Sequence, residues 1–177
     1  MEAQKAPPVP PPQQALELTS SEQLPTAIAY APRFHVLLVE DNLVNQKVLR
    51  KQLVRANCIV HVANHGQEAL DVLRKSRSCK DNNGQGLVIN VILMDVEMPV
   101  MDGLTCTRKV RVNEQRGQLV RRVIIIAVTA NARKEQTDTC LAAGMDDVMP
   151  KPFRVPDLIA KMEKLLDAQD SRLLCTP

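Results

Sequence analysis

Residues 91–95 read Val91-Ile92-Leu93-Met94-Asp95, a run of four apolar residues that ends on a carboxylate. Three other apolar runs also end on side chains that bind cations or phosphoryl oxygens: Glu40 and Asp41 after residues 35–39, Thr129 after 124–128, and Lys151 after 147–150. In an open α/β sheet, ligands bind beside the carboxyl ends of the parallel strands. We therefore expect these side chains, although distant in sequence, to converge on one site.

Strand and helix patterns alternate from Phe34 onward. We expect strands at residues 35–39, 58–62, 87–94, 122–128 and 146–149. Asn42 is placed to cap the first helix, Gly144 to end the fourth, and Pro156 to begin the fifth. Such alternation favours right-handed crossovers and a parallel sheet with helices on both faces. The sequence thus predicts an α/β fold with five parallel strands.

The first helix and the loop after the second have distinct patterns. Val44, Val48, Leu49 and Leu53 recur at helical spacing, so we expect them to form the buried stripe of the first helix. The polar run at residues 76–86 has the composition of a loop and is predicted to be a surface insertion.

The composition limits the classes of function. A net charge of +3 is too small to indicate a nucleic-acid-binding domain. The five cysteines form no C-x-x-C pair, which favours reduced thiols in an intracellular protein. No apolar run reaches the ~18 residues of a membrane span, and no secretory signal pattern begins the sequence. We expect a cytoplasmic or nuclear protein, with no nucleic-acid or membrane contact by this segment.

The chain divides into three parts by composition. Residues 1–33 hold seven of the twelve prolines and little apolar periodicity, so we expect a disordered Pro-rich linker. A ligand for a proline-binding domain is the alternative interpretation of this segment. Residues 34–168 carry the alternating pattern and are expected to form the folded domain, and residues 169–177 a C-terminal tail.

The predicted site combines carboxylates with a cation and a hydroxyl. Glu40, Asp41 and Asp95 would repel one another unless a cation joins them, and carboxylates with water and phosphate oxygens are the ligands Mg²⁺ prefers. Taken alone, Glu40-Asp41 is equally explained as an acidic pair at a helix N-terminus. Asp95 gains nothing for packing after an apolar run, and a carboxylate can act as a phosphoryl acceptor. Lys151 supplies a compact positive charge and Thr129 a hydroxyl donor.

Four motifs resemble those of one family. They are Val39-Glu40-Asp41-Asn42 followed by Asn45, Met94-Asp95-Val96-Glu97-Met98-Pro99-Val100-Met101-Asp102-Gly103, Ala127-Val128-Thr129-Ala130, and Gly144-Met145-Asp146-Asp147 with Lys151-Pro152-Phe153. The residues from Phe34 to Ala168 resemble the receiver domain of two-component response regulators, in particular the C-terminal receiver of eukaryotic, fungal-type hybrid histidine kinases. The resemblance implies a flavodoxin-like three-layer α/β/α sandwich with strand order 2-1-3-4-5.

The resemblance also implies roles for the site residues. Asp95 would accept a phosphoryl group from a phosphohistidine, and Lys151 and Thr129 would contact the phosphoryl oxygens. Mg²⁺ would be held by Glu40, Asp41, Asp95 and the backbone carbonyl of Glu97. The implied partners are a histidine kinase, or a kinase core in the same protein, and a histidine phosphotransfer protein that completes a two-component phosphorelay.

One position departs from the family pattern. Many receivers have tyrosine or phenylalanine three residues before the lysine, whereas this chain has Val148. Signalling through an aromatic rotamer is therefore in doubt, although phosphoryl acceptance is not. In the family, the positions of Glu97 and Asn131 tune the lifetime of the phosphoryl group. We also expect a cis bond between Lys151 and Pro152.

Two other function classes remain open from the residues. One is a pseudo-receiver that only binds proteins, and the other is a metal-dependent hydrolase, which would need an Asp-x-Asp arrangement where Glu97 stands. His35, His61 and His65 lie in ordinary strand or surface contexts. No kinase signature is present, and only nine residues follow residue 168, so we expect no DNA-binding output domain. The chain is then either a stand-alone receiver or the receiver end of a longer hybrid kinase, and we favour the second.

A cluster of basic residues in the second half of the chain has two possible interpretations. Either it is a solvated face, or it steers an acidic partner. Its members are Arg108, Lys109, Arg111, Arg116, Arg121 and Arg122.

Overall fold

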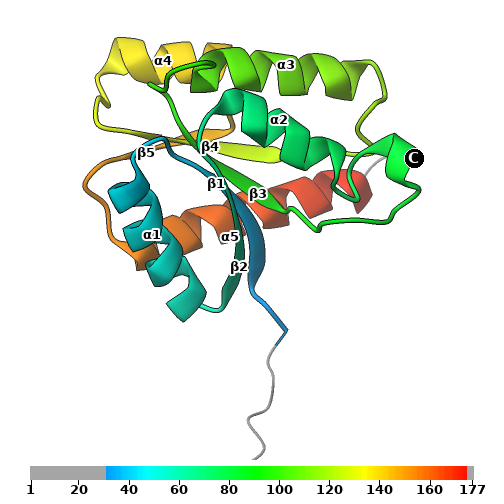
Figure 1. The fold of residues 1–177 in the computed structure, drawn as a ribbon, viewed down its shortest axis with the longest axis horizontal. Coiled ribbons are helices and arrows are strands. Elements are labelled where there is room, and N and C mark those ends of the chain that lie inside the picture. Colours follow the sequence, from blue (N-terminus) through cyan, green and yellow to red (C-terminus); the bar gives the residue numbers. More distant parts are fainter. Residues whose placement is uncertain (1–30, 175–177) are drawn as a thin grey trace, which may run out of the picture. The chain divides into compact units, whose positions relative to one another are not determined.

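A computed structural model describes residues 31–174 of the chain, so residues 1–30 of the expected linker lie outside the described part. Five strands alternate with five α-helices, as predicted, and one short 3-10 helix, η1, follows the second α-helix (Figure 1). The elements are β1 (Phe34–Val39), α1 (Leu43–Arg55), β2 (Cys58–Ala63), α2 (Gly66–Arg74), η1 (Lys80–Asn82), β3 (Val91–Asp95), α3 (Gly103–Gln115), β4 (Ile124–Thr129), α4 (Lys134–Ala142), β5 (Asp147–Pro150) and α5 (Val155–Leu174).

The five strands form one parallel sheet in the order β2-β1-β3-β4-β5. This confirms the α/β class, the three layers and the strand order. In the register of the sheet, Val39 pairs with Met94 and Asp95 pairs with Val128. The carboxyl ends of β1, β3 and β4 therefore lie level with one another. They lie beside the point, next to β1, where the strand order reverses and where open α/β sheets bind ligands.

Both faces of the sheet are buried, which explains the continuous apolar runs of the central strands. One core cluster joins Leu37, Ile92 and Ile125 to residues of α2, α3 and α4. The other joins Leu38 and Leu93 to residues of α1 and α5. Figure 1 shows the same division, with α2, α3 and α4 on one side of the sheet and α1 and α5 on the other.

The third strand is shorter than we predicted. It covers Val91–Asp95, whereas the apolar pattern had indicated residues 87–94. Asn90 explains the difference, because its side chain accepts a hydrogen bond from the His35 backbone N–H at 2.8 Å while its own N–H donates to the His35 carbonyl. Leu87 instead forms an isolated bridge with Ser76 and closes the predicted surface insertion.

The buried stripe of α1 was also predicted wrongly in part. Leu49 and Leu53 are buried, but Val44 is 69% and Val48 52% exposed. Gln46 is buried instead, and its amide donates to the backbone carbonyl of Glu40 at 3.0 Å. Apolar spacing alone did not reveal that a polar side chain is needed at this end of the helix.

Other local predictions can be compared directly with the structure. Gly144 follows α4 with a φ of 102°, which confirms the left-handed cap. The Lys151-Pro152 bond is cis, as expected. α5 begins at Val155 and continues to Leu174, so the helix runs beyond residue 168, where we had expected the tail to begin.

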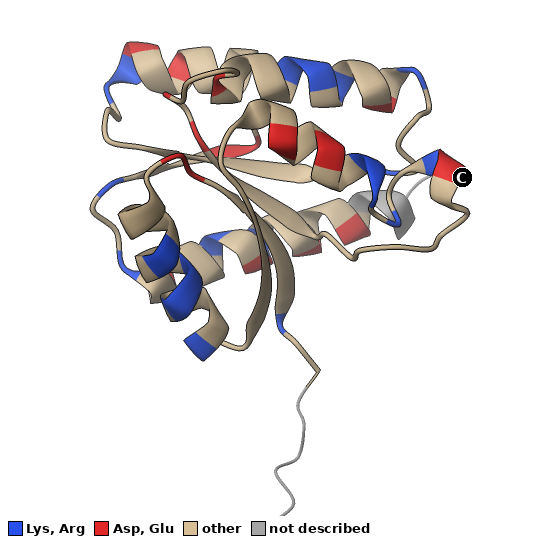
Figure 2. Cartoon of the chain, viewed as in Figure 1, with Lys and Arg blue, Asp and Glu red and all other residues tan. Residues whose placement is uncertain are grey.

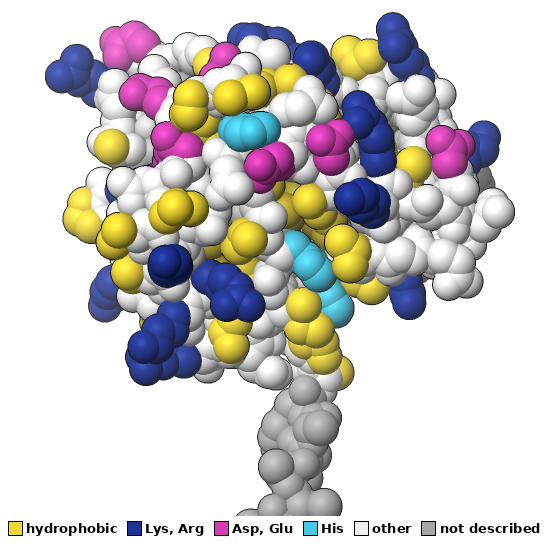
Figure 3. Space-filling view, viewed as in Figure 1, with side chains coloured by type: hydrophobic (Ala, Val, Ile, Leu, Met, Phe, Trp, Pro, Cys, Tyr) yellow, Lys and Arg dark blue, Asp and Glu magenta, His cyan; other side chains and the backbone are white. Residues whose placement is uncertain are grey.

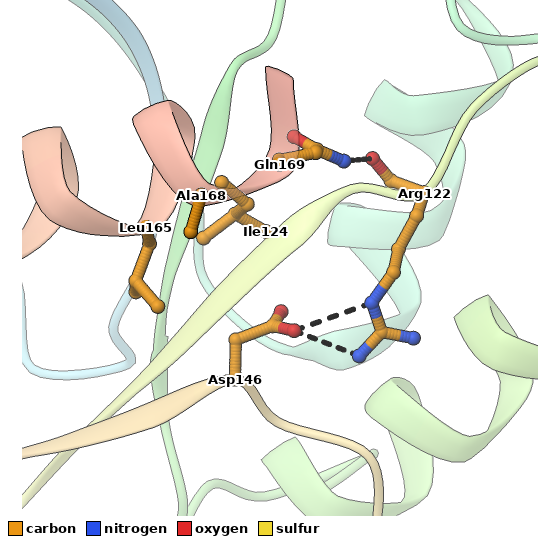
Figure 4. A pocket seen from close by; sticks show the side chains of 6 residues that line it. All are labelled: Arg122, Ile124, Asp146, Leu165, Ala168 and Gln169. Atoms are coloured by element: carbon orange, nitrogen blue, oxygen red, sulfur yellow. Dashed lines mark hydrogen bonds and ion pairs between the residues drawn. The ribbon is translucent and has the colours of Figure 1, made fainter. Parts of the chain in front are cut away.

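A network of ion pairs lies at the amino ends of β4 and β5, away from the predicted site. The Arg111 guanidinium donates to Asp146 at 2.8 Å and to Glu114 at 2.7 Å. Arg122 also donates to Asp146, at 2.7 Å (Figure 4). Arg111 is 8% exposed, so it belongs to the interior and not to a solvated basic face. The network links α3 to the loop before β5, and Gln169 of α5 joins it by donating to the Arg122 carbonyl.

The helices and the cysteines of the described part can be compared with the sequence patterns. Across residues 31–174, no helix combines the length and apolar character needed to cross a bilayer. Four cysteines in this part of the chain, Cys58, Cys79, Cys106 and Cys140, are buried free thiols. Burial raises the pKa of Cys106 to about 12, so this thiol stays protonated at neutral pH.

The register of α1 gives a stability prediction. Leu53→Ala removes a fully buried side chain and should lower the free energy of unfolding by about 2–5 kcal/mol. Val48→Ala, on the same helix but at an exposed position, should change it by less than about 0.5 kcal/mol. Urea unfolding of the two variants checks this, and similar losses for both would show that α1 packs in another register.

Candidate functional site

The structure brings all the predicted site residues to one pocket at the carboxyl end of the sheet. Its volume is about 420 Å³. It is lined by Glu40, Asp41, Asn42, Asn45, Asp95, Glu97, Thr129, Ala130, Asn131 and Lys151. In Figure 2 the red acidic segments after β1 and β3 lie together at this end of the sheet. The positions follow from the parallel register, because each residue comes at or just after the end of its strand.

Lys151 joins two of the carboxylates. Its Nζ donates to Glu40 Oε2 and to Asp95 Oδ2, both at 2.7 Å. Glu40 is almost completely buried and the Asp95 side chain is 14% exposed, so water screens these contacts only weakly. Burial by itself lowers the pKa of Lys151, but its hydrogen bonds and charge interactions with Asp95 and Glu40 outweigh burial and raise the pKa. Lys151 is therefore a cation at neutral pH.

Amide side chains of α1 hold Glu40 in place. Asn45 Nδ2 donates to Glu40 Oε1 at 3.2 Å, and Gln46 Nε2 donates to the Glu40 backbone carbonyl at 3.0 Å. Asn42 caps α1 by accepting from the N–H groups of Val44 and Asn45, as predicted. Neither Asn45 nor Gln46 was expected to contribute to the site. The available signal was their position in the first turns of the helix, close to the end of the strand that precedes it.

Asp95 retains free acceptor capacity on its second oxygen. Oδ2 is bonded to Lys151, whereas Oδ1 accepts one long hydrogen bond, of 3.3 Å, from the backbone N–H of Glu97. A carboxylate oxygen has two lone pairs, so Oδ1 can still bind a cation or attack an electrophile. The Asp95 carboxylate thus has one oxygen bonded to Lys151 and one oxygen with free acceptor capacity.

Thr129 and Val148 occupy the side of the site formed by β4 and β5. Thr129 is buried, and its Oγ1 donates to the Asn131 carbonyl at 3.2 Å and accepts from the Asn131 N–H at 3.1 Å. These bonds keep the hydroxyl within the loop that lines the pocket. Val148 is 8% exposed and packs in the core cluster on the α2, α3 and α4 side of the sheet. Val148 therefore stands where many receivers have an aromatic residue, and it packs as an ordinary core side chain.

The three carboxylates fit a divalent cation. One oxygen each from Glu40, Asp41 and Asp95 can be chosen so that all lie within 4.8 Å of one another. Asp41 is exposed and makes no ion pair with any residue of the described part. An oxygen-rich set with access to water matches Mg²⁺, which keeps several waters when it binds proteins. Lys151 neutralises part of the acidic charge, and a cation beside Asp41 would neutralise more.

Comparisons with known proteins agree with this geometry. The family model of the response regulator receiver domain matches residues 36–163. Hybrid signal transduction histidine kinase M of Dictyostelium discoideum is 38% identical over 76% of this chain and 5% of its own length. Two-component system protein A of Emericella nidulans is 37% identical over 82% of this chain and 20% of its length. The chain thus spans only a small part of these relatives.

Solved structures are similar over the same region. The receiver domain of the sensor histidine kinase PA1611 from Pseudomonas aeruginosa, which has a magnesium ion coordinated in its active-site cleft, is 35% identical with a TM-score of 0.58. The alignment covers 77% of this chain and 96% of that one. A second match is the co-crystal structure of the Saccharomyces cerevisiae histidine phosphotransfer protein Ypd1 and the Ssk1 receiver domain. It has 28% identity and a TM-score of 0.60, and the alignment covers 74% of this chain and 87% of that one.

The acidic cluster yields a prediction for Mg²⁺ binding. Asp41→Asn keeps the side-chain volume but removes one charge from the three carboxylates whose oxygens lie within 4.8 Å of one another, so Mg²⁺ affinity should fall by about tenfold or more. Glu97→Gln removes a charge from the same pocket but leaves the Glu97 carbonyl, and should have a clearly smaller effect. Calorimetric titration of both variants with MgCl₂ measures this. Equal losses would mean that only the overall charge of the pocket attracts the ion.

Proposed function

This chain belongs to the response regulator receiver domain family, and from that membership and the site geometry we propose that it accepts a phosphoryl group from a phosphohistidine onto Asp95. The observation that carries the proposal is the Lys151 contact to Asp95 Oδ2 at 2.7 Å inside a pocket with two further carboxylates. A carboxylate held beside a fixed cation is an oriented nucleophile, and the cation offsets part of the negative charge of the product.

The proposed transfer exchanges one bond to phosphorus for another. An oxygen of Asp95 attacks phosphorus and forms a P–O bond, while the P–N bond to the donor imidazole breaks. The imidazole nitrogen keeps the electron pair of that bond and takes a proton from solvent. Asp95 becomes an acyl phosphate and the donor becomes a neutral histidine. The same steps in reverse pass the group to the histidine of a phosphotransfer protein.

The surrounding residues would stabilise the charge on the phosphoryl oxygens. Lys151 supplies a fixed positive charge and Thr129 a hydroxyl donor at the pocket wall. Glu40, Asp41, Asp95 and the Glu97 backbone carbonyl would hold Mg²⁺, which supplies further positive charge to the transferring group when bound. Asn45 would keep Glu40 in the orientation that serves both Lys151 and the ion.

The surface next to the pocket suits a protein donor. Leu43, Val44 and Val48 are 57%, 69% and 52% exposed on the part of α1 that adjoins the pocket. The helix also carries Lys47, Arg50 and Lys51 and has no acidic residue. Figure 3 shows yellow and dark blue side chains gathered over α1. A mixed apolar and basic surface of this kind fits an acidic, apolar face that presents a phosphohistidine.

We also infer the setting of the domain from its relatives. Several are hybrid histidine kinases of which this chain spans only a few per cent, such as the 5% of kinase M. The chain is accordingly proposed to act as the receiver of a hybrid kinase in a phosphorelay. Its upstream donor would be a kinase core and its acceptor a histidine phosphotransfer protein.

Acetyl phosphate with Mg²⁺ tests acceptance by Asp95. The domain should form a stoichiometric, acid-labile adduct, and Asp95→Asn should abolish it because the variant loses the nucleophile but keeps the volume. Intact-mass spectrometry measures the adduct, and cooperative urea unfolding shows that the variant is folded.

The same experiment separates the other two function classes. A pseudo-receiver would give no adduct with the unaltered chain, and a hydrolase would release phosphate continuously without accumulating one. An adduct that persists in the folded Asp95→Asn variant would place the acceptor at another residue.

The α1 surface gives a prediction about the protein donor. Val44→Glu should slow transfer from a phosphorylated histidine phosphotransfer protein by about thirtyfold, since anchor residues contribute about 2 kcal/mol or more to an interface. Labelling by acetyl phosphate should stay unchanged. Val54→Glu, at a 49% exposed position on the same helix but farther from the pocket, is the matched control. Equal slowing by both would exclude the first turns of α1 as the contact.

A further inference from the structure

A second pocket lies at the opposite end of the strands from Asp95. It has a volume of about 260 Å³ and is lined by Arg77, Ser78, Val88, Ile89, Val120 and Arg121. Ile89 precedes β3 and Arg121 precedes β4, so the pocket lies at the amino ends of the strands whose carboxyl ends carry Asp95 and Thr129. The proposed phosphoryl-transfer site uses none of these residues.

Backbone hydrogen bonds fix two walls of this pocket. The Arg77 N–H donates to the Leu87 carbonyl at 2.8 Å, and the Val120 N–H donates to the Ser78 carbonyl at 2.8 Å. The surface insertion after α2 is thereby tied both to the segment before β3 and to the loop before β4. The positions of Arg77 and Ser78 are set by the fold, although the arginine side chain itself is exposed.

The charges around the pocket are unbalanced. Arg77 and Arg121 are exposed, and in the part of the chain that the structure describes neither forms an ion pair. Their neighbours Arg74 and Arg122 differ, because they pair with Asp71 and Asp146. Among residues 31–174, no acidic side chain lines the pocket. Figure 2 shows blue segments where α2 ends and its following connection begins. Two like charges beside one hollow favour an anion between them.

Ser78 adds a hydroxyl donor. The residue is 4% exposed, and its backbone N–H donates to Ser76 Oγ at 3.2 Å. Within residues 31–174, no hydrogen bond involves the Ser78 hydroxyl, which is part of the pocket lining. Within the described residues, the one fully buried side-chain oxygen without a partner is Thr107 Oγ1, so the Ser78 oxygen is accessible and can bond to water or a ligand in the pocket. Beside it, Val88, Ile89 and Val120 provide apolar wall, and Val120 is 63% exposed.

We propose that this pocket is a binding site for a phosphomonoester dianion attached to a small apolar group. Two guanidinium groups balance the two charges of the dianion and bind its oxygens in paired hydrogen bonds, which a carboxylate with one charge matches less well. Ser78 donates to a third oxygen, and the valine and isoleucine side chains contact the apolar group. The volume lies below the ~300 Å³ lower end of ordinary ligand sites, so a whole nucleotide does not fit.

Phenyl phosphate is a probe of this chemistry. Titration of the ¹⁵N-labelled chain without Mg²⁺ should shift the backbone amides of residues 77, 78, 120 and 121 and leave those at Asp95 and Thr129 unchanged. Benzoate, which has the same ring but one charge, should bind at least about tenfold more weakly. The double variant Arg77→Gln with Arg121→Gln should lose the shifts, whereas Arg116→Gln, an exposed arginine outside the pocket, should keep them.

Each outcome bears on the proposal. Shifts confined to the Asp95 pocket, equal affinity for benzoate, or equal loss in the Arg116→Gln control would overturn it. Ser78→Ala should weaken binding without unfolding the chain, and unchanged affinity in this variant would also contradict the proposed contacts. A phosphotyrosine tripeptide separates two sources of the ligand: tighter binding than phenyl phosphate points to a modified protein, and weaker binding to a small metabolite. The site is independent of Asp95 and should persist in Asp95→Asn.

Discussion

The hydrogen-bonded contact of Lys151 with both Glu40 and Asp95 is the interaction on which the site depends. The parallel sheet places the carboxylates of two neighbouring strand ends in a mostly buried position, where they would otherwise repel. A lysine from the end of β5, at 2.7 Å from each, converts this repulsion into a bridged set of charges. A divalent ion beside Asp41 and a phosphoryl group on Asp95 would each change this balance, so binding and chemistry at the site are electrostatically linked.

The fold holds these charges in place with contacts that leave little room for change. An added Cβ on Gly103 would lie 2.1 Å from the Asp95 backbone carbonyl oxygen, so only glycine permits α3 to start this close to β3. On the other side, Gln46 and Asn45 of α1 bond the backbone and the side chain of Glu40. Val148 packs in the core at the position where many receivers have an aromatic residue, so an aromatic rotamer at this position cannot carry a signal from Thr129.

The sequence predicted the strand ends well because apolar runs that stop at a charged or hydroxyl residue report both the strand and its functional end. It predicted α1 less well, since apolar spacing cannot show that Val44 and Val48 face outward while Gln46 serves a backbone carbonyl. Asn90 shortened β3 through a side-chain bond to His35 that depends on strand pairing. The second pocket was not predicted, because Arg77, Ile89 and Arg121 come together only through loops whose course depends on long-range contacts.

Identification of the phosphorylated residue tests whether Asp95 is the phosphoryl acceptor. The chain would be incubated with a phosphorylated histidine phosphotransfer protein and Mg²⁺, then treated with borohydride, which reduces an aspartyl phosphate to homoserine. Peptide mass spectrometry should find homoserine at position 95 and leave Asp41, Glu40 and Glu97 unmodified. Homoserine at another aspartate, or no reduction product from a chain that carries the phosphoryl label, would contradict the assignment of Asp95 as the acceptor.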